Sequence, residues 1–179
     1  MGAKVEMPCR AALSRHMNGR VFAKAAGAAA CVIWLDAGAQ VVPTPDRFGD
    51  AMQYLLPAAA IGLTLHQGDR EGLEQFAYSA VLSQGSTVAL GAIVNSPRPD
   101  GGSRGFPSGH TSIAFVSAAY VHQRYGLWPA IPMYGLATLT GYSRVRTHHH
   151  FTKDVIGGAA VGIGSAFLLT HRKRPAMTP

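Results

Sequence analysis

At 179 residues the chain has room for one domain with a buried core. Apolar residues make up 47% of it and charged residues only 14%, against about 25% charged in an ordinary soluble domain. This composition favours a membrane protein or a very apolar helical bundle. The mean hydropathy of +0.11 is nevertheless low for a chain made only of membrane-spanning helices.

The net charge of +7 favours anionic partners. After residue 39 the basic residues are scattered rather than arranged in a stripe, and several stand beside His and Gly. That distribution suits a small anionic group better than nucleic acid, which we do not expect as a partner. Cys9 and Cys31 are the only cysteines, so no disulfide framework or cysteine-based metal site follows.

Residues 1–39 resemble an export signal. A basic stretch precedes a short apolar run from Ala25 to Leu35, and Ala37-Gly38-Ala39 has the small-x-small pattern of a cleavage site. The basic region is long for a signal peptide, and Asp36 interrupts the pattern. We therefore expect either a cleaved signal peptide or a retained N-terminal membrane helix, followed by one domain over residues 40–179.

Residues 41–46 (VVPTPD) are rich in proline and predict an extended linker. Five apolar stretches of helical length follow, with no alternation of period two. They run from Asp50 to about His66, Asp69 to about Asn95, Gly109 to Tyr125, Pro129 to about Arg144, and Thr152 to about His171. The pattern predicts an all-α bundle of about five to six helices, with its active site in inter-helix loops at one end.

Chemistry-bearing residues gather where these stretches begin and end. His150 and Asp154 are four residues apart, so at a helix entry they share one face. A carboxylate that accepts from one ring nitrogen leaves the other as a nucleophile. Asp154 could equally be an ordinary acidic residue in the first turn of a helix.

The segment Pro107-Ser108-Gly109-His110 enters another helix, where free backbone N–H groups favour an anion. Ser108 could instead be a simple helix cap. Arg98 and Arg144 add two permanent cations whose planar donor forks suit phosphate oxygens.

Together these motifs resemble those of the type 2 phosphatidic acid phosphatase superfamily, which includes vanadium haloperoxidases. That family carries Lys-x6-Arg-Pro, Pro-Ser-Gly-His and Ser-Arg-x5-His-x3-Asp. The second motif is complete here as residues 107–110, and the third as Ser143-Arg144, His150 and Asp154. The first departs from the pattern, because Gly91 stands where the family has lysine. Arg104, Arg146 or Lys153 could supply the missing cation.

The resemblance implies a phosphatase that needs no metal or other cofactor. His150 would attack phosphorus, Asp154 would orient it, and His110 would protonate the leaving group. Arg98, Arg144, Ser108 and the backbone of Gly109 would bind the phosphate. The expected substrates are phosphomonoesters or diphosphates, of lipids in the first place.

The resemblance also implies a location at the cell membrane or in the periplasm, with the site on the extracytoplasmic side. Two alternatives stay open: a soluble exported acid phosphatase of broad specificity, and a membrane protein that binds lipid phosphates with catalysis impaired by the change at Gly91. The sequence does not indicate an oligomeric state.

Overall fold

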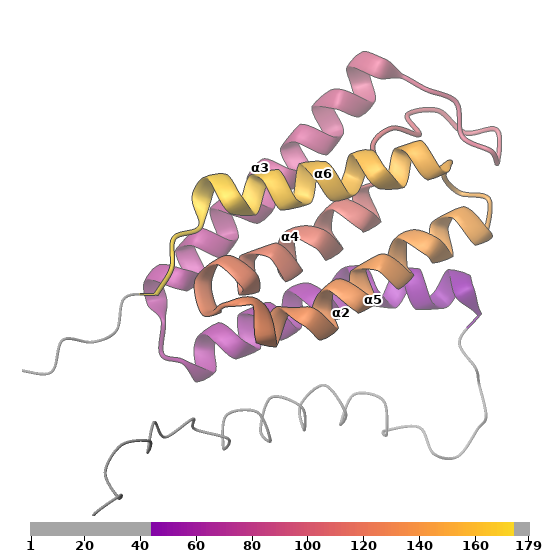
Figure 1. Cartoon of the computed structure of the whole chain (residues 1–179). Coiled ribbons are helices and arrows are strands. Elements are labelled where there is room, and N and C mark those ends of the chain that lie inside the picture. Colours follow the sequence, from indigo (N-terminus) through magenta and orange to yellow (C-terminus); the bar gives the residue numbers. More distant parts are fainter. Residues whose placement is uncertain (1–43, 174–179) are drawn as a thin grey trace, which may run out of the picture.

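A computed structural model describes residues 44–173; the N-terminal segment discussed above lies outside them. Within this range the chain forms five helices and no strand, which confirms the all-α prediction. They are α2 (Pro45–His66), α3 (Arg70–Val94), α4 (Gly109–Tyr125), α5 (Leu127–Arg146) and α6 (Thr152–Leu169). Figure 1 shows α4 in the middle of the bundle, and α4 contacts each of the other four helices.

Two of the predicted boundaries were wrong. The linker was expected to reach Asp46, but α2 already begins at Pro45. Proline is well tolerated at the first helical position, since it lacks only an N–H that would have no helical partner there. The fourth helix begins at Leu127, two residues before Pro129, for the same reason. Pro57 and Pro132 both lie inside continuous helices.

Helix α3 turns its polar face inward. Ser79, Ser83 and Thr87 of α3 are buried, and the Ser83 hydroxyl lies 2.6 Å from that of Ser112 on α4. Most large apolar side chains of α3 point outward instead, with Ile93 79% exposed, while Phe76 packs in the core. A helix that buries hydroxyls and exposes aliphatic groups is suited to lipid surroundings.

Two helices, α3 and α6, are long and apolar enough to cross a membrane, by length and composition. Small residues let α6 approach α4 closely. A Cβ added at Gly158 or Gly162 would collide with the backbone of residues 108 or 112. Glycines four residues apart thus form the contact face of α6.

A buried ion pair stabilises the end of the bundle opposite the first turn of α6. Arg124 at the end of α4 donates to both carboxylate oxygens of Asp69, each at 2.7 Å. This pairing strongly lowers the pKa of Asp69. Arg124 also donates to the His171 carbonyl, so the pair ties the turn before α3 to the chain after α6.

Candidate active site

The three motifs meet at one end of the bundle. Helices α2, α4 and α6 begin there, and α3 and α5 end there. In Figure 1 this is the end that carries the loop between α3 and α4. Segments far apart in the sequence are therefore brought together by the up-and-down course of the helices.

His150 lies in the short loop between α5 and α6 and is 4% exposed. Its Nδ1 is 2.8 Å from the carbonyl oxygen of Gly105. A carbonyl can only accept, so Nδ1 carries the proton and Nε2 is left with its lone pair. Burial, followed by the nearby charge of Arg98, lowers the pKa of His150, which keeps the ring neutral over a wider range of pH.

Asp154 is fully buried in the first turn of α6. Its Oδ2 accepts from the Phe151 backbone N–H at 2.9 Å and lies 3.7 Å from Nδ1 of His150. The carboxylate therefore caps the helix and stands close to the imidazole without being its nearest acceptor. The sequence offered two interpretations of Asp154, as a partner of His150 and as an ordinary acidic residue of a first helical turn. Each describes part of this geometry.

Ser108 and Gly109 form the entry to α4. Ser108 is fully buried, and its backbone N–H donates to the Asp154 carbonyl at 2.9 Å. Its hydroxyl lies 3.1 Å from that of Thr111. Gly109 is the first residue of the helix, where N–H groups point out of the bundle end without helical partners.

His110 is held by a residue of α2 that the motifs do not include. Its Nε2 lies 3.2 Å from Oδ1 of Asp50, so the proton on that nitrogen faces the carboxylate. Burial and the charge of Arg144 lower the pKa of His110, while Asp50 raises it. A positive charge on His110 is the smallest of the causes that act on the pKa of His150.

Arg144 is 3% exposed and is also held by α2. Its Nη1 donates to Asp50 at 3.0 Å, and its Nη2 donates to the carbonyl and carboxylate of Asp46. Asp46 further accepts from His149 at 2.9 Å. The two aspartates of α2, four residues apart, thus fix Arg144 and His110 from the same side.

Buried polar atoms without partners mark the centre of this region. Within residues 44–173 there are five such side-chain atoms: Gln84 Nε2, Ser96 Oγ, Arg98 Nε, Arg144 Nε and Asp154 Oδ1. Four of the five belong to the three motifs, and the fifth, in Gln84, lies beside Gly109 of the second motif. Because an unpaired buried donor costs about 1–3 kcal/mol, their concentration indicates a place prepared for a polar ligand or water.

The structure brings the predicted residues together, but sequence reasoning missed several partners. Asp46 and Asp50 were counted as linker and helix cap, although acidic residues four apart in a chain with only nine of them were a usable signal. The carbonyl of Gly105 carried no signal, because any residue has one. In the described residues no three His, Cys, Asp or Glu side chains are grouped as metal ligands.

Comparisons with known proteins agree with this geometry. A family model described as the PAP2 superfamily matches residues 100–177. The lipid A 4'-phosphatase of Helicobacter pylori is 32% identical over 142 residues, which cover 73% of this chain and 71% of that protein. The chain belongs to the PAP2 superfamily.

Two further PAP2 comparisons point the same way. The lipid A 1-phosphatase of Helicobacter pylori is 26% identical over 75% of this chain and 76% of its own length. The crystal structure of Aquifex aeolicus LpxE superposes with a TM-score of 0.59 and 25% identity, over 72% of this chain and 87% of the other. The protein is thus a membrane phosphatase of the PAP2 type, a phosphoric ester hydrolase.

Proposed function

We propose that this protein removes phosphate from a phosphorylated lipid, with lipid A as the leading substrate, through a phosphohistidine formed on His150. The unpartnered buried polar atoms of the three motifs carry the proposal. The relatives named as lipid A phosphatases support the substrate class. The exposed apolar side chains of α3 and α6 support contact with the bilayer from which such a lipid would come.

Phosphate would be bound by groups of the three motifs and by the entry to α4. Arg98 and Arg144 each keep a buried Nε without a partner in the described residues, and a phosphate oxygen is the strongest acceptor for such a donor. The N-terminus of α4 adds backbone N–H groups of Gly109 and its neighbours, and the helix dipole favours the negative charge. Ser108 can contribute its hydroxyl.

In the first step, Nε2 of His150 attacks phosphorus, and the bond from phosphorus to the leaving oxygen breaks. His110 in its protonated form gives that oxygen a proton. The phosphorylated ring of His150 keeps its Nδ1–H and becomes positively charged. The Gly105 carbonyl at 2.8 Å and the Asp154 carboxylate at 3.7 Å stabilise this charge.

In the second step, neutral His110 takes a proton from water, and the oxygen of that water attacks phosphorus. The bond from phosphorus to Nε2 breaks, phosphate leaves, and both rings return to their initial states. Asp50 holds His110 through Nε2, so Nδ1 is the nitrogen that exchanges the proton with the leaving oxygen and the water. No metal takes part in this sequence of steps.

We further propose that the site faces the extracytoplasmic side. Helix α6 starts at the site and ends before the basic residues from His171 onward. Basic residues that follow a spanning helix favour the cytoplasmic side, which would place the site on the other. The resemblance of residues 1–39 to an export signal agrees with this orientation.

The test is phosphate release by the purified protein in detergent micelles, with lipid A and p-nitrophenyl phosphate as substrates. The proposal expects higher kcat/KM for lipid A, and a product that mass spectrometry identifies as lipid A with one phosphate fewer. Preference for the soluble ester would favour a broad acid phosphatase. Absence of turnover on both, with retained lipid A binding, would favour the impaired protein.

A further inference from the structure

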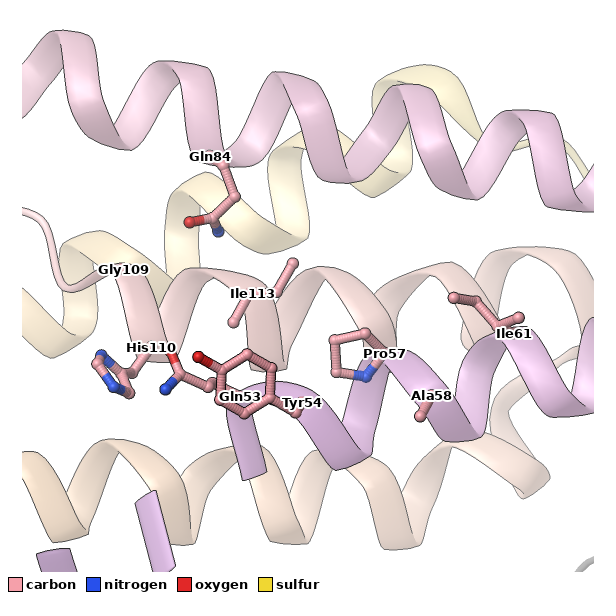
Figure 2. Close-up of a pocket in the computed structure, with 9 residues that line it drawn as sticks. All are labelled: Gln53, Tyr54, Pro57, Ala58, Ile61, Gln84, Gly109, His110 and Ile113. Atoms are coloured by element: carbon pink, nitrogen blue, oxygen red, sulfur yellow. The ribbon is translucent and has the colours of Figure 1, made fainter. Parts of the chain in front are cut away.

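A groove of about 500 Å³ opens on the side of the bundle beside His110. Gly109 and His110 line one end of it, and its walls include Tyr54, Pro57 and Ile113. Figure 2 shows the groove bordered by α2, α4 and, on the opposite side, Gln84 of α3. The volume falls in the range of small-molecule sites, which is about 300–1,000 Å³.

The course of the helices explains why the groove exists. Helix α2 ends and α3 begins at the turn that connects them, and the two helices diverge from there toward the site end (Figure 1). Apolar side chains of α2 and α4 cover the floor between them. The groove therefore connects the proposed site with the lateral surface of the bundle.

Two side-chain amides, Gln53 and Gln84, line this groove, and Gln84 is the one with a buried donor that lacks a partner. Its Nε2 is buried and has no hydrogen-bond partner within residues 44–173. Neighbouring polar groups are already occupied, since Ser83 and Thr87 bond to Ser112. Gln84 is partly buried at the edge of the groove, so a polar group bound in the groove could accept a hydrogen bond from this amide.

The position of the amide identifies which part of a ligand it would meet. A Cβ added at Gly109 would lie 3.8 Å from Oε1 of Gln84, so the amide stands beside the helix entry that would hold the phosphate. His110 would protonate the leaving oxygen, and His110 lines the groove. The leaving group must therefore extend from the phosphate into the groove, past Gln84.

We infer that Gln84 selects phosphorylated lipids whose leaving group carries an oxygen acceptor a few bonds from the ester oxygen. Nε2 donates a hydrogen bond to that acceptor, and the attached chain follows the apolar wall. An acylated sugar or an acylated glycerol offers such a carbonyl or hydroxyl; an isoprenoid alcohol offers none. This inference rests on the proposed function, because it assigns the leaving-group side of the same site.

The experiment compares kcat/KM of wild type and Gln84→Met in mixed micelles. Methionine keeps the length of the side chain and removes the donor. The probes are phosphatidate, whose leaving group carries ester carbonyls, and farnesyl monophosphate, whose leaving group has an apolar chain alone. One neutral hydrogen bond predicts a loss of about threefold to tenfold on phosphatidate and a change of less than about twofold on farnesyl monophosphate.

Equal losses on the two lipids, or no loss on phosphatidate, would overturn the inference. Gln84→Leu repeats the comparison with a different shape, so that a packing defect of one variant is recognised by its effect on both lipids. Gln123→Leu is the matched control, since this α4 residue lies outside the groove and should change neither value. Failure of wild type on both lipids, with lipid A still hydrolysed, would overturn the inference alone, whereas failure on lipid A as well would refute the proposed function.

Discussion

The glycine at position 91 predicts that Arg104 acts as the third cation of the phosphate site. Gly91 faces the loop between α3 and α4: a Cβ added there would lie 3.6 Å from the Phe106 carbonyl and 3.7 Å from Cβ of Arg104. A lysine side chain from position 91 and the side chain of Arg104 would thus begin at nearly the same place. Arg104 has a φ of 56°, a backbone conformation that non-glycine residues adopt mainly at constrained or functional positions.

The other candidates are less well placed. The Nζ of Lys153 lies 5.6 Å from the ring centroid of Phe151, a cation–π position on the outside of α6. Arg146 is exposed in the last turn of α5. Neither is adjacent to the position that the family lysine would occupy.

The expected size of the effect follows from the exposure of Arg104. Removal of one preorganised donor to a transition-state oxyanion costs about 2.7–4 kcal/mol in enclosed sites. Arg104 is exposed in the ligand-free protein, so solvent screening reduces its contribution. We expect about 2 kcal/mol, or about thirtyfold in kcat/KM, for Arg104→Ala.

The assay is phosphate release from lipid A or phosphatidate at several substrate concentrations. Gly91→Lys in the Arg104→Ala background should restore most of the loss, because the Cβ at position 91 meets only ordinary contacts. Gly91→Lys alone should bring no gain, since two like charges would then compete for one place. Lys153→Ala is the control, with little change. Activity of Arg104→Ala close to wild type, or no rescue by the lysine, would refute this reasoning.

Three further predictions concern the residues that support the site. Asp50→Asn should move the alkaline limb of the kcat/KM profile to lower pH, because Asp50 raises the pKa of His110 and His110 must be protonated to act as the acid. Asp46 does not contact His110, so Asp46→Asn should leave this limb in place. Asp154→Asn should lower kcat about tenfold or more, since it removes a charge 3.7 Å from Nδ1 of His150; a loss below about twofold would contradict this. Arg124→Ala should lower the free energy of unfolding by about 3–5 kcal/mol, measured by thermal denaturation in detergent, while the folded fraction keeps its kcat, because the pair with Asp69 lies at the other end of the bundle.

The fold could be predicted from the sequence because each helix is a long apolar stretch ended by glycine, proline or polar residues. The boundaries at Pro45 and Leu127 were missed because proline, usually a sign of irregular structure, is also favoured in a first helical turn. The close packing of α6 on α4 depends on Gly158 and Gly162. The spacing of these glycines favours a close neighbouring helix but does not identify which helix it is.

The candidate site could be predicted only as far as its motifs extend. His110, Arg144, His150 and Asp154 lie within local patterns whose residue types indicate their chemistry. The groups that orient them come from distant parts of the chain: Asp50 from α2 and the Gly105 carbonyl from the loop before α4. Such contacts depend on how the helices pack, and no local spacing reports them.

The central claim is that His150 becomes phosphorylated, and rapid quenching with a lipid labelled at its phosphate tests it most directly. The protein should carry label on His150 that is stable in alkali and lost in acid. His150→Ala should carry no label and release no phosphate. Turnover by His150→Ala near the wild-type rate, or label on another residue, would contradict the account.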